Sequence, residues 1–137
     1  ANLNDILPFK VTNPNSPDVP IQVKHLVTHT SGFNDSEEAY LMNYYLLKSV
    51  DLRDPIVTLI TGYGNPISDG IPLGEYLKDC FTPSGKFYNV DNFAKEPAGT
   101  NYAYSNIAAS LAAYLILLRC YHQQCRLSHG LIHSSIL

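Results

Sequence analysis

The segment from Glu96 to Leu111, EPAGTNYAYSNIAASL, decides the local fold, because a Pro/Gly turn runs directly into an alanine-rich helix. Ser105 is placed to cap that helix, and Tyr104 and Asn106 flank the cap. A phenol and a carboxamide at the mouth of a helix can transfer a proton and bind an amide or ester group. An ordinary helix start with a packing aromatic residue explains the same triplet, so the Tyr-x-Asn pattern by itself leaves both interpretations open.

The residues after Ser105 predict a strong helix. Its apolar side chains fall on one stripe, which consists of Ile107, Leu111, Tyr114, Leu115 and Leu118. Small side chains would let a neighbouring helix approach closely, and these are Ala108, Ala109, Ala112 and Ala113. We expect Ile107, Leu111 and Leu115 to lack the neighbouring surface that would otherwise bury them.

The composition is that of one globular domain. The 137 residues are enough for a single core, and 45% hydrophobic with 15% charged residues are typical of a folded chain. The net charge of −3 and the scattered Lys and Arg residues predict no nucleic-acid partner. The longest apolar run, from Ile107 to Leu118, is shorter than the ~20 residues of a membrane span. Three cysteines without a CxxC pair predict neither a disulfide framework nor a zinc site, and we expect no cofactor.

The rest of the chain predicts short helices joined by long loops. Four prolines between Ala1 and Pro20 favour an extended loop over the surface. Helices are expected from Ile21 to His29, ended by Gly32, from Ser36 to Lys48, and from Pro72 to Leu77. Residues 56–61 fit either a helix or a strand, and residues 81–93 fit a loop or hairpin anchored by Tyr88 and Phe93.

Two segments resemble motifs of one superfamily. IQVKHLVTHTSGF, from Ile21 to Phe33, resembles the ITVRHLLTHTSGL signature of the serine β-lactamases and penicillin-binding-protein-like proteins. More narrowly, it is similar to the class C-like branch that includes esterases and D-aminopeptidases. EPAGTNYAYSN, from Glu96 to Asn106, resembles the PGTxFxYSN segment that carries the Tyr-x-Asn motif of that branch. The order and separation of the two segments fit as well.

The resemblance implies an α/β fold, in which an α/β sandwich domain and a mostly helical lobe enclose the active site. Residues 1–114 are then a partial β-lactamase-related domain, mostly helical with long loops, that ends beyond the Tyr-x-Asn motif. The implied mechanism is covalent, since a serine of an S-x-x-K motif forms an acyl-enzyme that water hydrolyses. By position, Tyr104 is the expected catalytic residue for proton transfer and Asn106 the expected substrate-binding residue, while His29 is expected to be structural. The substrate is a small-molecule β-lactam, peptide or ester.

Two motifs of the family do not occur in the chain. No serine is followed by lysine three residues later, and there is no K-T-G. We therefore expect an internal fragment that lacks the remainder of its domain, so its compartment, whether periplasmic, secreted or cytoplasmic, stays open. An ordinary tyrosine has a pKa of about 10, and in the family the lysines of these motifs lower it. We expect the chain alone to be inactive, and the alternative is a non-catalytic binding or scaffold module derived from the same fold.

Residues 115–137 depart from the resemblance. The family is polar and acidic here, whereas LILLRCYHQQCRLSHGLIHSSIL contains two cysteines, three histidines and no acid. We interpret this atypical tail as the product of a frameshift near Leu115, because a shifted reading frame can encode family-like residues. A metal site would be the alternative reading of its i, i+3 and i+4 spacing, with the ligands His122, Cys125, His129 and His133. We favour the frameshift and expect no metal.

Overall fold

A computed structural model describes residues 1–36 and 71–133, with the backbone alone from residue 122 onward. Within these residues the elements are η1 (Leu3–Asp5), α1 (Val23–Val27), α3 (Leu73–Phe81), η3 (Val90–Asn92) and α4 (Asn106–His133). The described part has no strand beyond two isolated β-bridges, so it is mostly helical with long loops, as the sequence predicts. The helix predicted from Ser36 to Lys48 and the undecided residues 56–61 fall outside the described residues, apart from Ser36 itself.

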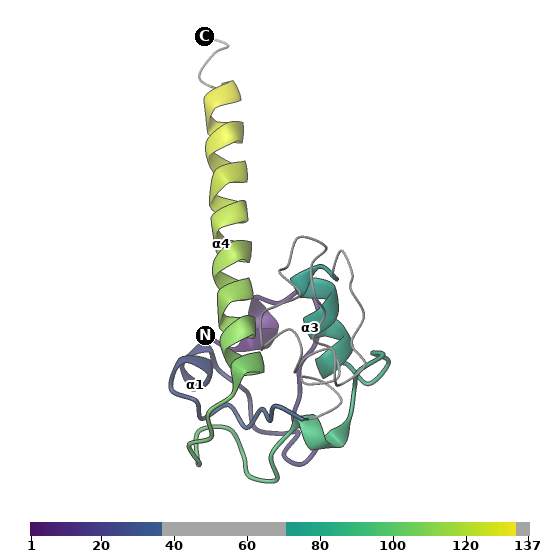
Figure 1. Cartoon of the computed structure of the whole chain (residues 1–137). Helices are drawn as coiled ribbons and strands as arrows, with labels where there is room; N and C mark the ends of the chain where they lie inside the picture. The colour runs from purple at the N-terminus through teal and green to yellow at the C-terminus, as the bar shows by residue number, and fades with distance from the viewer. Residues whose placement is uncertain (37–70, 134–137) are drawn as a thin grey trace, which may run out of the picture.

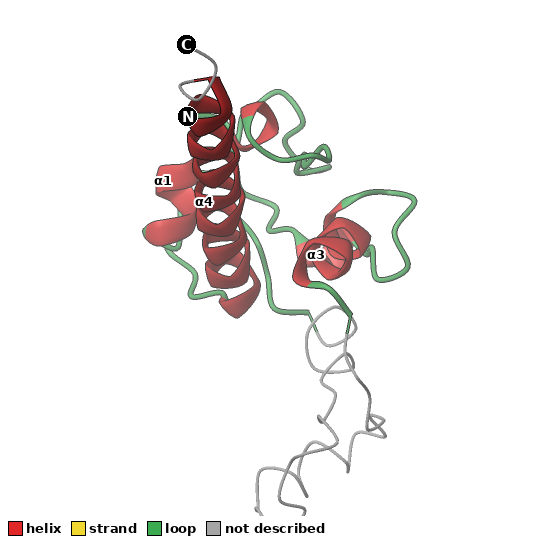
Figure 2. Ribbon diagram, turned by 90° about the horizontal axis from the view of Figure 1, so that it is seen from above, coloured by secondary structure: helices red, strands yellow, loops and turns green. Residues whose placement is uncertain are grey.

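Helix α4 is the axis of the structure (Figure 1). Helices α1 and α3 flank its N-terminal half on opposite sides (Figure 2). Its C-terminal half extends beyond them (Figure 1). The predicted stripe faces this packing, because Ile107, Leu111 and Leu115 are buried. The expectation that these three residues lack a partner is therefore wrong, since the rest of the described chain covers them. Ala109 and Ala113 are exposed, so only half of the predicted alanine surface takes part in packing.

The first twenty residues enter the core and do not merely run over the surface. Leu3, Leu7 and Val11 are buried. The side chain of Asn4 fixes this segment, because its amide donates to the carbonyl of Val11 at 3.0 Å and its Oδ1 accepts the Val11 N–H at 2.8 Å. Leu3, Leu7 and Val11 are four residues apart, but the prolines of this segment favour an extended loop, and for that reason the sequence analysis did not predict their burial.

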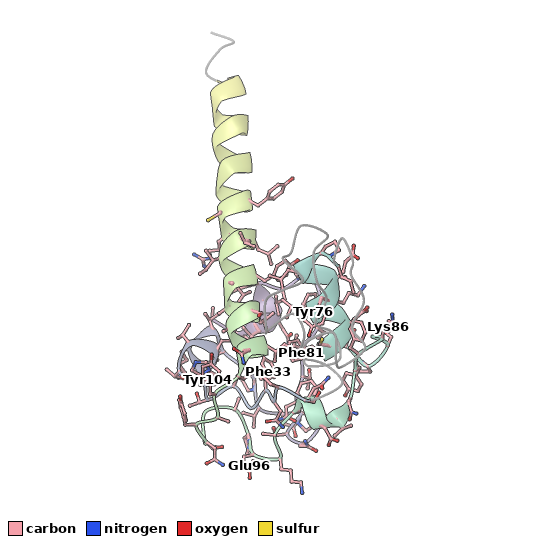
Figure 3. The ribbon with its side chains drawn as sticks, viewed as in Figure 1. Phe33, Tyr76, Phe81, Lys86, Glu96 and Tyr104 are labelled. Atoms are coloured by element: carbon pink, nitrogen blue, oxygen red, sulfur yellow. The ribbon has the colours of Figure 1, made fainter. Side chains whose placement is uncertain are left out.

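An aromatic cluster fills the space between α3 and the loops around it. The rings of Phe33 and Phe81 lie side by side (Figure 3), with 4.3 Å between their centroids. The ring of Phe93 packs 5.8 Å from that of Phe33. Tyr88 packs 6.0 Å from Phe93, so both predicted anchors of residues 81–93 are in contact. This segment is a loop with the short η3 turn and does not form a hairpin.

The buried side chain of Asn92 closes the loop over this cluster. Its amide donates to the carbonyls of Cys80, at 2.9 Å, and Phe87, at 3.0 Å, while its Oδ1 accepts from the Ser36 hydroxyl. Burial raises the pKa of the neighbouring Cys80 thiol to about 12; the Asp79 charge acts in the same direction, and a hydrogen bond with Tyr76 opposes it. The side chain of Asn92 thus connects three separate segments, through Ser36, Cys80 and Phe87.

Gly85 allows the chain to turn back along the end of α3. The N–H of Gly85 donates to the carbonyl of Thr82 at 2.8 Å, and the next contact, from the Phe87 N–H to the carbonyl of Asp79, is 3.2 Å long. A Cβ atom at Gly85 would lie 2.2 Å from the carbonyl oxygen of Asp79. Because that atom belongs to the backbone, a side chain at this position has no room.

The variant Gly85→Ala should lower the free energy of unfolding by about 1–3 kcal/mol, because the methyl group overlaps the backbone of α3. The measurement is urea unfolding followed by circular dichroism. Ser84→Ala changes the exposed neighbour and is the matched control, expected to stay within about 0.5 kcal/mol of the parent chain. Equal unfolding midpoints for the two variants would contradict the close approach.

Candidate functional site

The N-terminus of α4 is capped twice. The Ser105 hydroxyl accepts the Ala108 N–H at 3.1 Å, which confirms the predicted cap. The carboxylate of Asp35 accepts the N–H groups of Asn106, at 2.8 Å, and Ile107, at 3.1 Å, and also the Ser105 hydroxyl at 2.9 Å. These N–H groups have no partner within the helix, and the positive end of the helix dipole favours an anion beside them. Asp35 therefore fixes the start of α4.

The same carboxylate orients the predicted site residues. The Nδ2 group of Asn106 donates to Asp35 at 2.8 Å, and the Oδ1 atom of Asn106 accepts the Tyr104 hydroxyl at 3.0 Å. The side chain of Tyr104 is 63% exposed, and Figure 3 shows it beside the base of α4. The structure thus joins Tyr104 and Asn106 directly and leaves the phenol open to solvent.

His29 holds the segment that leads into α4. Its φ of 53° lies in the left-handed region, which residues other than glycine rarely adopt. Its carbonyl accepts the Ala103 N–H at 2.8 Å, and its Nδ1 accepts the Ser105 N–H at 3.3 Å. Its ring packs against Tyr104, with 4.7 Å between centroids, and edge-on against Tyr102 at 6.0 Å. These contacts agree with the structural role expected for His29.

The first helix ends earlier than the sequence predicts. Gly32 was expected to stop that helix, but α1 ends at Val27 and the left-handed residue just beyond it is His29. Gly32 has its own positive φ of 73° in the following turn, where its carbonyl accepts the Ala94 N–H at 2.8 Å. Gly32 therefore forms the turn that follows and does not end α1.

The two segments that carry the family resemblance lie against each other. Besides the His29 contacts, the N–H of Gly99 donates to the carbonyl of Thr30 at 2.7 Å. Gly99 has a φ of 90°, and a Cβ atom there would lie 3.2 Å from Nε2 of His25. Glycine at this position therefore lets the PAGT turn approach α1 closely.

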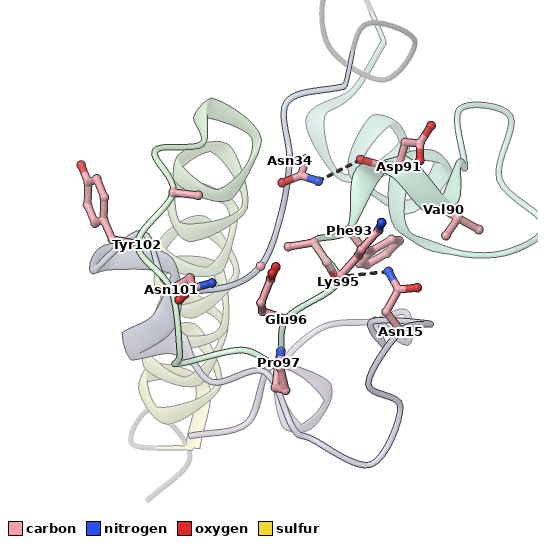
Figure 4. Close-up of a pocket in the computed structure, with 13 residues that line it drawn as sticks. Asn15, Asn34, Val90, Asp91, Phe93, Lys95, Glu96, Pro97, Asn101 and Tyr102 are labelled. Carbon is pink, nitrogen blue, oxygen red and sulfur yellow. Dashed lines mark hydrogen bonds between the residues drawn. The ribbon is translucent and has the colours of Figure 1, made fainter.

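A cavity of about 600 Å³ adjoins this site (Figure 4). In that view Asn101 and Tyr102 lie on one side, Asp91 and Lys95 on the other, and Glu96 between them. Within the described part of the chain, the side chains of Lys95 and Glu96 have no hydrogen-bond or ion-pair partner. The sequence analysis missed this cavity, because residues far apart in the chain form it and no short motif marks it.

Several predicted features concern the rest of the chain. The backbone of α4 continues without a break across the predicted boundary between residues 114 and 115. The side chains of His122, Cys125, His129 and His133 fall outside the described ones. Among the described residues, no group of three or more His, Cys, Asp or Glu is arranged to hold a metal ion. No helix in that part is both long and apolar enough to cross a membrane.

Replacing Asp35 tests the double cap. Burial raises the pKa of its carboxyl. The hydrogen bonds from Asn106, Ile107 and Ser105 together lower the pKa by a larger amount, so the net pKa lies below the ordinary value of 3.8. The carboxylate therefore stabilises the folded state fully above pH 3.8, and this contribution is lost as the pH falls through the folded-state pKa.

We expect Asp35→Asn to lower the free energy of unfolding at pH 7 by about 1–3 kcal/mol, because one of the two accepting oxygens becomes an NH2 group and the negative charge at the helix terminus is lost. The variant should also lose part of the decline in stability below pH 3.8. Chemical unfolding at a series of pH values measures both effects. Asp18→Asn removes the same charge from an exposed position and serves as the control, and an equal loss in that variant would argue against the cap.

In comparisons with known proteins, no protein-family model, no curated protein and no solved structure matches the chain. The chemistry of the site therefore follows from its own groups. It offers an exposed phenol, a carboxamide whose orientation is fixed, and a carboxylate behind them at the end of a helix.

Proposed function

We propose that this chain carries the Tyr-x-Asn wall of the active site of a serine hydrolase of the β-lactamase-related family. The observation that supports the proposal is the contact between the two segments that resemble the family. His29 of the HTSG turn bonds to Ser105 and packs on Tyr104. This contact agrees with a common site, because an active site needs its groups held in one geometry.

In this proposal the described helices belong to the helical lobe of an α/β sandwich fold. Tyr104 transfers the proton between the attacking or leaving group and its surroundings, and Asn106 binds the carbonyl group of the substrate. The substrate is a β-lactam, a peptide or an ester. The acyl-enzyme forms on a serine of an S-x-x-K motif, which is not among these 137 residues. The chain by itself thus supplies one wall of the active site and no nucleophile.

The chain alone should form no acyl-enzyme. Incubation with a fluorophosphonate or a penicillin should leave its mass unchanged, because no serine has a lysine in the S-x-x-K position. Intact-protein mass spectrometry measures the adduct, and an active class C-like enzyme treated in parallel confirms that the probe reacts. A stoichiometric adduct on any serine would contradict this part of the proposal.

A graft tests the catalytic role. Residues 21–106 replace the matching segment of an active class C-like esterase, and the turnover of the hybrid is measured. Tyr104→Phe should then lower kcat by about 10²- to 10⁴-fold, because the variant loses the proton-transfer group. Tyr102→Phe is the matched control, since Tyr102 is similarly exposed and packs on the same His29 ring. A folded but inactive hybrid, or equal losses in the two variants, would overturn the proposal.

A binding or scaffold module derived from the same fold is the second candidate. The cavity beside Tyr102 supports it, since about 600 Å³ lies within the 300–1,000 Å³ usual for small-molecule sites. The charges of Lys95 and Glu96, which have no partner among the described residues, would bind a polar ligand there. The graft separates the candidates, because a module that only binds supports no turnover in the hybrid.

A further inference from the structure

The carboxamide of Asn106 has two chemically different ends. Its Nδ2 group carries two donors, and its Oδ1 atom can only accept. An ionised carboxylate also only accepts, so the Nδ2 end of Asn106 must face Asp35, at 2.8 Å. The Oδ1 end then faces Tyr104, at 3.0 Å, and the phenol must donate its proton to it. One charge therefore fixes the direction of two successive hydrogen bonds.

This direction determines what the pair presents to solvent. The oxygen of Tyr104 keeps its lone pairs, and Nδ2 of Asn106 keeps one N–H, since no other described group bonds to them. The pair therefore offers an acceptor next to a donor. A primary amide, in which the carbonyl oxygen and one N–H lie on the same side of the C–N bond, matches both. The C=O and N–H of a trans peptide group point in opposite directions, and an ester has no N–H to donate to Tyr104.

We propose that Asp35 is a positioning residue that sets the donor–acceptor polarity of the Tyr104–Asn106 pair, and that this polarity favours a primary amide over an ester group. The preference for an amide rests on the proposed hydrolase function. The positioning role does not, because it is a property of this chain in any function.

A helix cap alone would not have this effect. The cap requires only the contacts of Asp35 with the backbone N–H groups of Asn106 and Ile107. The additional contact with the Asn106 side chain decides which end of the amide faces Tyr104. Without the carboxylate, the amide could rotate by half a turn, and the hydrogen bond with the phenol could reverse.

Nuclear magnetic resonance of the 137-residue chain tests the positioning role. We expect one side-chain amide proton of Asn106 to be shifted strongly downfield at pH 7, because it is bonded to a carboxylate. The shift should collapse on acidification, in step with protonation of Asp35. Asn106 side-chain protons with ordinary shifts that do not change with pH would overturn the proposal, and this measurement needs no variant.

Two variants separate positioning from capping. Asp35→Asn should abolish the shifted proton, whereas Ser105→Ala should retain it, because that variant loses the hydroxyl cap but keeps the bond from Asn106 to Asp35. If Ser105→Ala removes the signal as fully as Asp35→Asn does, the effect is due to loosening of the helix and the proposal fails. If Asp35→Asn does not fold, the titration of the parent chain decides.

The esterase hybrid tests the preference for an amide. Asp35→Asn should lower kcat/KM at least tenfold more for a primary amide substrate than for the ester with the same acyl group. Equal losses for both substrates would show a merely structural role and overturn the preference. An inactive hybrid of the parent sequence would refute the proposed hydrolase, and with it the preference, while the resonance of Asn106 would still decide the positioning role.

Discussion

One carboxylate connects the two halves of this structure. Asp35 lies just beyond the turn that follows α1, and it binds four donors at the start of α4, three of them on Asn106 and Ile107 and one on Ser105. A charge-assisted hydrogen bond to a helix terminus is stronger than a neutral one, and here the acceptor is also partly withdrawn from water. The position of α4, and with it the geometry of Tyr104 and Asn106, depends on this contact.

The strained backbone of His29 has a place in the same arrangement. A left-handed conformation costs a residue other than glycine about 1–2 kcal/mol. In return, the carbonyl and Nδ1 of His29 bind Ala103 and Ser105, and its ring packs between two tyrosines. Such strain persists only where neighbouring contacts over-determine it, and it often lies close to functional groups. His29 and Asp35 together define the entry to α4 from two directions.

The sequence revealed what depends on near neighbours. The stripe from Ile107 to Leu118, the Ser105 cap and the helix after Pro72 all follow from residues within a few positions of one another. Tyr104 and Asn106 were predicted as site residues from a motif, whereas the hydrogen bond between them came from the structure. The role of Asp35 was not predicted, because its carboxylate caps α4 from a distant position in the sequence and leaves no local pattern. The same reason hid the three segments that meet at Asn92 and the cavity beside Tyr102. The burial of Leu3 and Val11 was not predicted, because the prolines of this segment favoured an extended loop over the surface.

The burial of Cys80 on the inner face of α3 has a kinetic consequence. Only the thiolate attacks alkylating and disulfide reagents, and a thiol whose pKa is about 12 is almost entirely protonated at neutral pH. With no exposed surface as well, Cys80 can react only after α3 separates from the aromatic cluster. Its rate of modification therefore reports the opening of that region, whereas exposed Cys120 reacts without any such event. The reactivity of Cys80 is thus a built-in measure of local unfolding around α3.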